Sequence, residues 1–231
     1  MSAALVLGLA CGLVASWIAD WLPARIDTEG DSGTPPIPPS AAVVPGRRAI
    51  WRLALLVPGS MALAVYLYLA HSWSAYFWAQ FPVSEVLLLI AVIDLEHQLV
   101  PNILVASGLA MSLLSSALTA QPGLRSAVIG SVVAAALFLA IAAFGRGALG
   151  AGDVKLAVLI GTVNGFPQVL QALVMGILLG GMAAGVLLLT RLRGPKQYIP
   201  YAPYLVAGCL STLLFGQHIA RWWQHLPVWG G

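Results

Sequence analysis

Two acidic residues lie at the edges of long apolar segments, where charged groups are rare. Asp153 belongs to the segment 150–155, GAGDVK, which stands between two apolar runs, and Asp94 directly follows the apolar run 86–93. Ionised carboxylates are costly in or near hydrocarbon, so both residues are candidate functional groups. Two carboxylates that lie close together share a proton, so one acts as an acid and the other as a base. Such a pair can activate a water molecule and protonate the leaving amine of a peptide bond.

The residues around Asp153 suggest supporting roles. Gly150 and Gly152 allow the backbone to turn sharply or to approach another molecule closely, and their N–H groups are candidate donors to a developing negative charge. Lys155 could steady that charge or pair with a lipid phosphate. The Gly-x-Gly pattern does not predict a nucleotide site, because it lacks a preceding strand and a Lys-Ser/Thr ending.

Each acidic residue also has a purely structural explanation. Asp94 could be an interfacial carboxylate in contact with water, and Asp153 could be the N-cap of the next helix. Glu85, at the start of the same apolar run as Asp94, is either a partner near the site or an interface residue. Glu96 and His97 could join Asp94 around a metal ion, but no second histidine stands at ligand spacing, so no metal is predicted.

The composition predicts an integral membrane protein. The 231 residues are 60% hydrophobic and 8% charged, and the mean hydropathy is +0.91. Soluble domains carry about 25% charged residues. The net charge of +3 is small and bears on membrane topology, so no nucleic-acid partner is predicted. We expect an all-α, polytopic helical bundle that forms one domain, 1–231, with a short Pro-rich loop at 23–48.

Apolar runs of membrane-spanning length predict seven or eight transmembrane helices, since about 20 residues cross the hydrocarbon core. Glycines at 176, 180, 181 and 185 in the seventh run predict close helix packing. The expected spans are 3–22, 53–70, 83–93 with turns preceding it, 102–118, 126–144, 154–163, 169–190 and a last one ending near 217.

Counting crossings along these spans predicts that Asp94 and Asp153 end on the same membrane face. That face also collects most of the basic residues, whereas the other face has only Arg125 and Arg221. The positive-inside rule then puts both aspartates at the cytoplasmic side. The basic residues on the predicted cytoplasmic face are Arg25, Arg47, Arg48, Arg52, Arg146, Lys155, Arg191, Arg193 and Lys196.

The segments 94–102, DLEHQLVPN, and 150–155, GAGDVK, resemble the two signatures of the type IV prepilin peptidases, the GXGD class of membrane aspartic proteases. The segment 199–204, IPYAPY, is similar to a third stretch common in that family. The resemblance implies that Asp94 and Asp153 are the catalytic pair and that Gly150 and Gly152 are the motif glycines.

The resemblance further implies a bacterial inner-membrane enzyme that cleaves the basic leader from prepilins or pseudopilins at the cytoplasmic face. Glu96 is then a candidate contact for the basic leader. Larger family members also methylate the new N-terminus with S-adenosylmethionine and carry two Cys-x-x-Cys pairs near the first span. The segment 23–48 has no cysteine, so no zinc site is expected, no cofactor is predicted, and S-adenosylmethionine would be used only if methyl transfer were retained.

A membrane transporter that uses Asp94 and Asp153 as a proton relay is the alternative from another functional class. Inverted repeats or discontinuous helices would favour it, but the sequence shows no convincing internal duplication.

Overall fold

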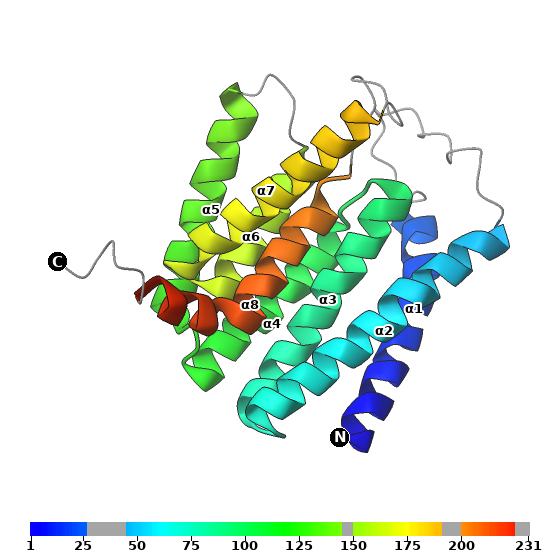
Figure 1. The fold of residues 1–231 in the computed structure, drawn as a ribbon, viewed down its shortest axis with the longest axis horizontal. Helices are drawn as coiled ribbons and strands as arrows, with labels where there is room; N and C mark the ends of the chain where they lie inside the picture. The colour runs from blue at the N-terminus through cyan, green and yellow to red at the C-terminus, as the bar shows by residue number, and fades with distance from the viewer. Residues whose placement is uncertain (27–44, 145–149, 191–199, 225–231) are drawn as a thin grey trace. The chain divides into compact units, whose positions relative to one another are not determined.

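The computed structural model describes residues 1–26, 45–144, 150–190 and 200–224, and the secondary structure in these ranges is helical (Figure 1). This result confirms the predicted all-α class. The helices are α1 (Ser2–Ile26), α2 (Pro45–His71), α3 (Ala75–His97), α4 (Asn102–Thr119), α5 (Leu124–Phe144), α6 (Ala151–Asn164), α7 (Gln168–Leu189) and α8 (Ala202–Gln224).

Six of these helices, α1 to α5 and α7, are long and apolar enough to cross a membrane. In α8 the apolar part, Ala202–Gly216, is shorter. Helix α6 has 14 residues and is therefore about 21 Å long, less than the roughly 30 Å of a hydrocarbon core. The chain is a multi-pass membrane protein, and the helix that carries Asp153 is its shortest described helix.

Several helices extend beyond the predicted spans. Helix α1 continues through Pro23 to Ile26, and α2 begins at Pro45 rather than Leu53, so the predicted loop at 23–48 is shorter than expected. The remainder of that loop, the glycine-rich break 145–149, the basic loop 191–196 and the tail from 225 lie outside the described residues.

The chain divides into two compact units, residues 1–111 and 112–231, and the division falls within α4. In the first unit α1, α2 and α3 contact one another. Gly8 and Gly12 of α1 lie against the backbone of α2 at Met61 and Val57, where a Cβ atom would have no room. The backbones of α1 and α2 therefore cross at close range. The prediction of a single domain stays a prediction.

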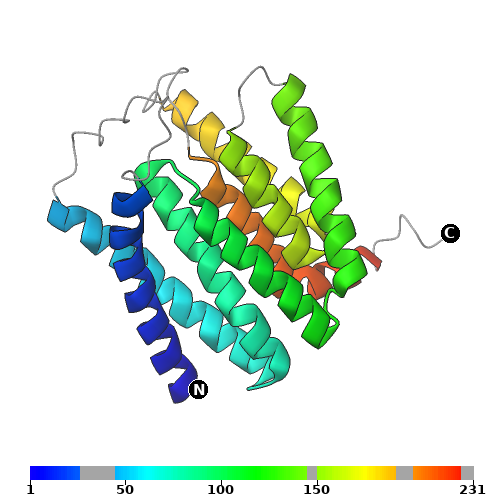
Figure 2. The ribbon, with the colours of Figure 1, turned by 180° about the vertical axis from the view of Figure 1, so that it is seen from behind.

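In the second unit α5 packs on α6 and α7 packs on α8, as the ribbon seen from behind also shows (Figure 2). Gly130 and Gly161 face each other at the α5–α6 crossing, and each leaves no room for a Cβ on the other. The predicted close packing of α7 is confirmed at Gly176 and Gly180, which contact Leu205 and Tyr201. It is wrong at glycines 181 and 185, which face open space.

Candidate active-site residues

Asp94 lies in the last turn of α3, so the prediction that this helix ends at Asp94 was one turn short. Asp94 is 2% exposed. Gln98 adopts a left-handed conformation with φ of 54° and donates its backbone N–H to the Asp94 carbonyl oxygen at 2.9 Å, which ends the helix. The Asp94 carboxylate is thus attached to a defined helix end.

Glu96 occupies the same turn and is already engaged by other side chains. Its carboxylate lies 3.4 Å from the Arg52 guanidinium and 3.8 Å from the His97 imidazole. Arg52 comes from α2 and also forms an ion pair with Asp20 of α1. Sequence reasoning used Arg52 only as a topology marker. The signal it overlooked was a single cation at the edge of an apolar run, which needs nearby anions when it is buried.

Asp153 lies in the first turn of α6. The N-cap of this helix is Gly150, so the structural explanation of Asp153 as the N-cap itself is wrong, and Asp153 is the third helical residue. Its carboxylate accepts a hydrogen bond from the Gly150 N–H at 3.2 Å, and its own N–H donates to the Gly150 carbonyl at 3.1 Å. Gly150 has φ of −76° and ψ of 152°, which any residue can adopt, so a sharp turn does not explain this glycine.

Asp153 is 4% exposed, and it precedes the apolar part of α6. Burial raises the pKa of Asp153 above its ordinary value, and the hydrogen bond from Gly150 opposes that increase. Gly152 is half-buried beside it, whereas Lys155 is exposed. The first turns of α6 therefore present a buried carboxyl group and an exposed ammonium group on one helix end.

Tyr201 is a neighbour of Asp153 that sequence reasoning did not single out. Burial raises the pKa of Tyr201, and the negative charge of Asp153 raises it further. The tyrosine ring contacts α7 at Gly180, and its carbonyl oxygen accepts the N–H groups of Tyr204 and Leu205 at the start of α8. Its position inside the segment 199–204, already noted for its family resemblance, was the available signal.

Glu85 is remote from Asp94. It accepts a hydrogen bond from Ser60 of α2 at 2.7 Å and lies nine residues before Asp94 on α3, about 13 Å along the helix axis. Of the two explanations offered for it, a place beside Asp94 is excluded. Within the described ranges, no group of three or more His, Cys, Asp or Glu side chains could hold a metal ion.

The structure thus assembles two sets of residues. Asp94 and Glu96 lie with Arg52 in the first unit, and Gly150, Gly152, Asp153 and Lys155 lie at the start of α6 in the second. The pairing of Asp94 with Asp153 joins residues of different units, and it stays a prediction.

Residues 83–185 match the model of the type IV leader peptidase family. This segment contains both Asp94 and Asp153. The matched segment belongs to the type IV leader peptidase family. The family consists of aspartic-type peptidases, in agreement with the two acidic motifs. Arg52 and Tyr201 lie outside the matched residues.

Similar proteins of this family are named prepilin leader peptidase/N-methyltransferase. The chain is 33% identical over 147 residues to the one from Bacillus subtilis, a match covering 62% of this chain and 58% of that protein. It is 28% identical over 180 residues to that of Aeromonas hydrophila, covering 76% and 61%. It is 32% identical over 142 residues to that of Pseudomonas aeruginosa, covering 58% and 48%. The chain therefore spans about half to three fifths of the length of these relatives, and no solved structure matches it.

Proposed function

We propose that this chain is an aspartic endopeptidase that removes the basic leader peptide from type IV prepilin-like or pseudopilin substrates. The observation that carries this proposal is that one segment, 83–185, matches the leader peptidase family and contains both aspartates. Each aspartate is buried at the end of a helix, where a carboxyl group can be held near the membrane boundary.

The proposed chemistry uses the two carboxyl groups as an acid and a base. One ionised carboxylate takes a proton from a water molecule, and the resulting hydroxide attacks the scissile carbonyl carbon. The other carboxyl group, still protonated, gives its proton to the leaving amine as the C–N bond breaks. General acid–base steps of this kind contribute about 10² to 10⁴ in rate, and positioning and electrostatic stabilisation supply the rest.

We assign the base to Asp153, because burial raises its pKa and so makes its carboxylate a stronger proton acceptor, while the hydrogen bond from Gly150 limits that increase. Its carboxylate accepts the Gly150 N–H at a helix N-terminus, where the partial positive charge of the helix favours an anion. Asp94 is then the acid at the start of the cycle. Because the Gly150 N–H points to Asp153, the N–H groups of Ala151 and Gly152 are the better candidates to stabilise the oxyanion. Lys155, which is exposed, is assigned to charge stabilisation or to lipid phosphate.

The proposed location is the bacterial inner membrane, with the active site at the cytoplasmic face. The excess of basic residues in the connections on the side of Asp94 and Asp153 supports this orientation. The substrate would be a prepilin or pseudopilin whose hydrophobic helix lies in the bilayer and whose basic leader remains in the cytoplasm. The proposal does not extend to methyl transfer, since the only cysteines of the chain are Cys11 and Cys209, both within apolar helices.

The test is cleavage of a purified prepilin by the purified chain in detergent micelles. Asp94→Asn and Asp153→Asn should each lower the cleavage rate by at least about 10³-fold while the protein remains folded, because each removes one proton-transfer group. Glu85→Gln is the matched control: it removes a third partly buried carboxyl group of the membrane helices but keeps the acceptor for Ser60, and cleavage should be unchanged.

Two results would contradict the proposal. An asparagine variant that cleaves at the rate of the unmodified chain would exclude that residue from the reaction. Failure of the unmodified chain to cleave any prepilin, together with proton uptake into proteoliposomes that depends on both aspartates, would favour the transporter. Mass measurement of the product's N-terminus reports on methyl transfer in the same experiment.

A further inference from the structure

Arg52 is a buried cation that links three helices of the first unit. Its side chain is 5% exposed, and its guanidinium contacts Asp20 of α1 and Glu96 of α3. The Asp20 side chain is 63% exposed and the Glu96 side chain 14% exposed. Because solvent weakens an exposed ion pair, the contact with Glu96 is the one that matters more.

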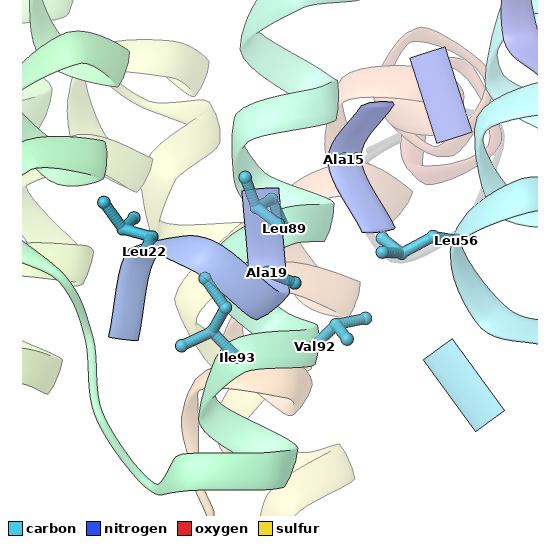
Figure 3. Close-up of a cluster of buried hydrophobic side chains, with 7 residues drawn as sticks. All are labelled: Ala15, Ala19, Leu22, Leu56, Leu89, Val92 and Ile93. Carbon is cyan, nitrogen blue, oxygen red and sulfur yellow. The ribbon is translucent and has the colours of Figure 1, made fainter. Parts of the chain in front are cut away.

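An apolar cluster is formed by the same three helices (Figure 3). It combines residues of α1, α2 and α3, namely Ala15, Ala19, Leu22, Leu56, Leu89, Val92 and Ile93. Ala19 precedes Asp20, Leu56 lies one turn after Arg52, and Ile93 precedes Asp94. The ionic group and the apolar cluster therefore involve neighbouring residues on the same three helices.

The ionic group and the apolar cluster restrain α3 in different ways. Apolar contacts depend on buried area and tolerate rotation or sliding of a helix, whereas an ion pair forms only where the two charged groups come together. A buried ion pair adds little net stability compared with apolar packing, and fixing one arrangement among several is its best-attested use. The Arg52–Glu96 pair is therefore suited to setting the register and rotation of the last turn of α3.

We propose that Arg52 is a positioning residue for Asp94 and acts through Glu96. Glu96 and Asp94 share the last turn of α3, which ends at Gln98. Holding Glu96 against α2 holds the Asp94 carboxyl group in place. This inference rests on the proposed function and assigns Glu96 to shaping the site rather than to binding the basic leader.

The first experiment measures cleavage kinetics of Arg52→Met, which removes the charge at similar length, and of Glu96→Gln. Each should lower kcat by about 100-fold, the cost of misplacing a reacting group by about 1 Å, and leave KM within about twofold. The double variant should be no worse than either single variant, because both remove the same interaction. Arg52→Lys, which keeps the charge, should recover part of kcat.

The matched control is Arg125→Met, which makes the same substitution at an exposed arginine of α5 and should leave kcat and KM unchanged. A purely structural role would make the loss of activity follow the loss of folded protein, measured by thermal unfolding in micelles. If Glu96 instead bound the leader, Glu96→Gln would raise KM, and the effect would vanish with a leader whose basic residues had been neutralised. Either outcome would overturn the proposal.

Hydrogen–deuterium exchange gives a readout that does not need activity. In Arg52→Met the amides of residues 94–98 should exchange at least about tenfold faster, because the last turn of α3 opens more readily. Unchanged exchange with unchanged kcat would exclude the positioning role. If exchange accelerates but even the unmodified chain cleaves no prepilin, the proposed function fails and the restraint on α3 stands.

Discussion

The end of α3 and the start of α6 each carry an acidic residue, but they hold it by different means. Asp94 lies in the last turn of a 23-residue helix, and side-chain ion pairs through Arg52 tie that turn to neighbouring helices. Asp153 lies in the first turn of a 14-residue helix, where its carboxylate accepts the N–H of Gly150 at the N-cap, and the same helix is held against α5 by the glycine crossing at Gly161. The position of Asp94 therefore depends on ion pairs between side chains, and the position of Asp153 depends on backbone contacts.

The two helix ends also differ in the partial charge that their free backbone groups present. A helix N-terminus offers N–H groups to a carboxylate, as at Asp153, whereas a helix C-terminus offers carbonyl groups, as at Asp94. In the proposed catalytic pair, two aspartates at opposite kinds of helix end would be unequal before any substrate arrives. This inequality is what acid–base catalysis by two identical side chains requires.

The α5–α6 crossing gives the largest expected effect on stability. Gly161→Ala should lower the free energy of unfolding by about 1–3 kcal/mol, because the added methyl group meets the backbone of Gly130, which cannot move aside cheaply. Thermal unfolding in detergent micelles measures the loss, and cleavage should fall with it because α6 carries Asp153.

The control for this change is Gly185→Ala on α7, where a methyl group meets open space. It should not destabilise the protein, since alanine favours a helix over glycine by about 0.5–1 kcal/mol. If the two alanine variants had the same free energy of unfolding, the backbone contact at Gly161 would not be what holds α6 in place.

The pH dependence of stability tests how Asp153 is held. Since the folded protein raises the pKa of Asp153 above the ordinary 3.8, the folded state binds this proton more tightly than the unfolded state does. Stability is then lost as pH rises from 3.8 through the raised folded value. Asp153→Asn, which keeps an oxygen acceptor for Gly150, should unfold at a higher temperature than the unmodified chain near neutral pH.

Below pH 3.8, Asp153→Asn should unfold at the same temperature as the unmodified chain. Asp153 then carries its proton in both the folded and the unfolded state of the unmodified chain. Parallel unfolding profiles of the two proteins across the whole pH range would contradict the assigned burial of Asp153.

The N-cap gives the smallest expected effect on stability. Gly150→Ser should stabilise α6 by a few tenths of a kcal/mol, because serine caps a helix slightly better than glycine and φ of −76° suits it. Cleavage should nevertheless fall by about tenfold, since the new side chain blocks close approach of the substrate to the first turn. A variant with higher stability and full activity would show that Gly150 has no functional role.

Much of the fold could be predicted from hydrophobic patterning, because a membrane helix must bury its backbone and present an apolar surface of known length. Seven or eight transmembrane helices were predicted in this way; the described residues form eight helices, of which six are long and apolar enough to cross a membrane. Helix boundaries were less predictable: α2 begins at Pro45 rather than Leu53, because polar residues such as Arg52 can lie in a helix that extends past the apolar segment. The glycine pattern of α7 identified Gly176 and Gly180 as packing sites but did not distinguish them from glycines 181 and 185, since spacing alone does not show which side of a helix meets a neighbour.

The sequence by itself determined the membrane class, the two acidic motifs and the family to which residues 83–185 belong, because these properties depend on residue types and local spacing. Only the tertiary structure decided that Glu96 pairs with Arg52, that Glu85 pairs with Ser60 and that Gly130 meets Gly161. These contacts join residues from 25 to 44 positions apart, and their formation depends on how whole helices rotate and cross.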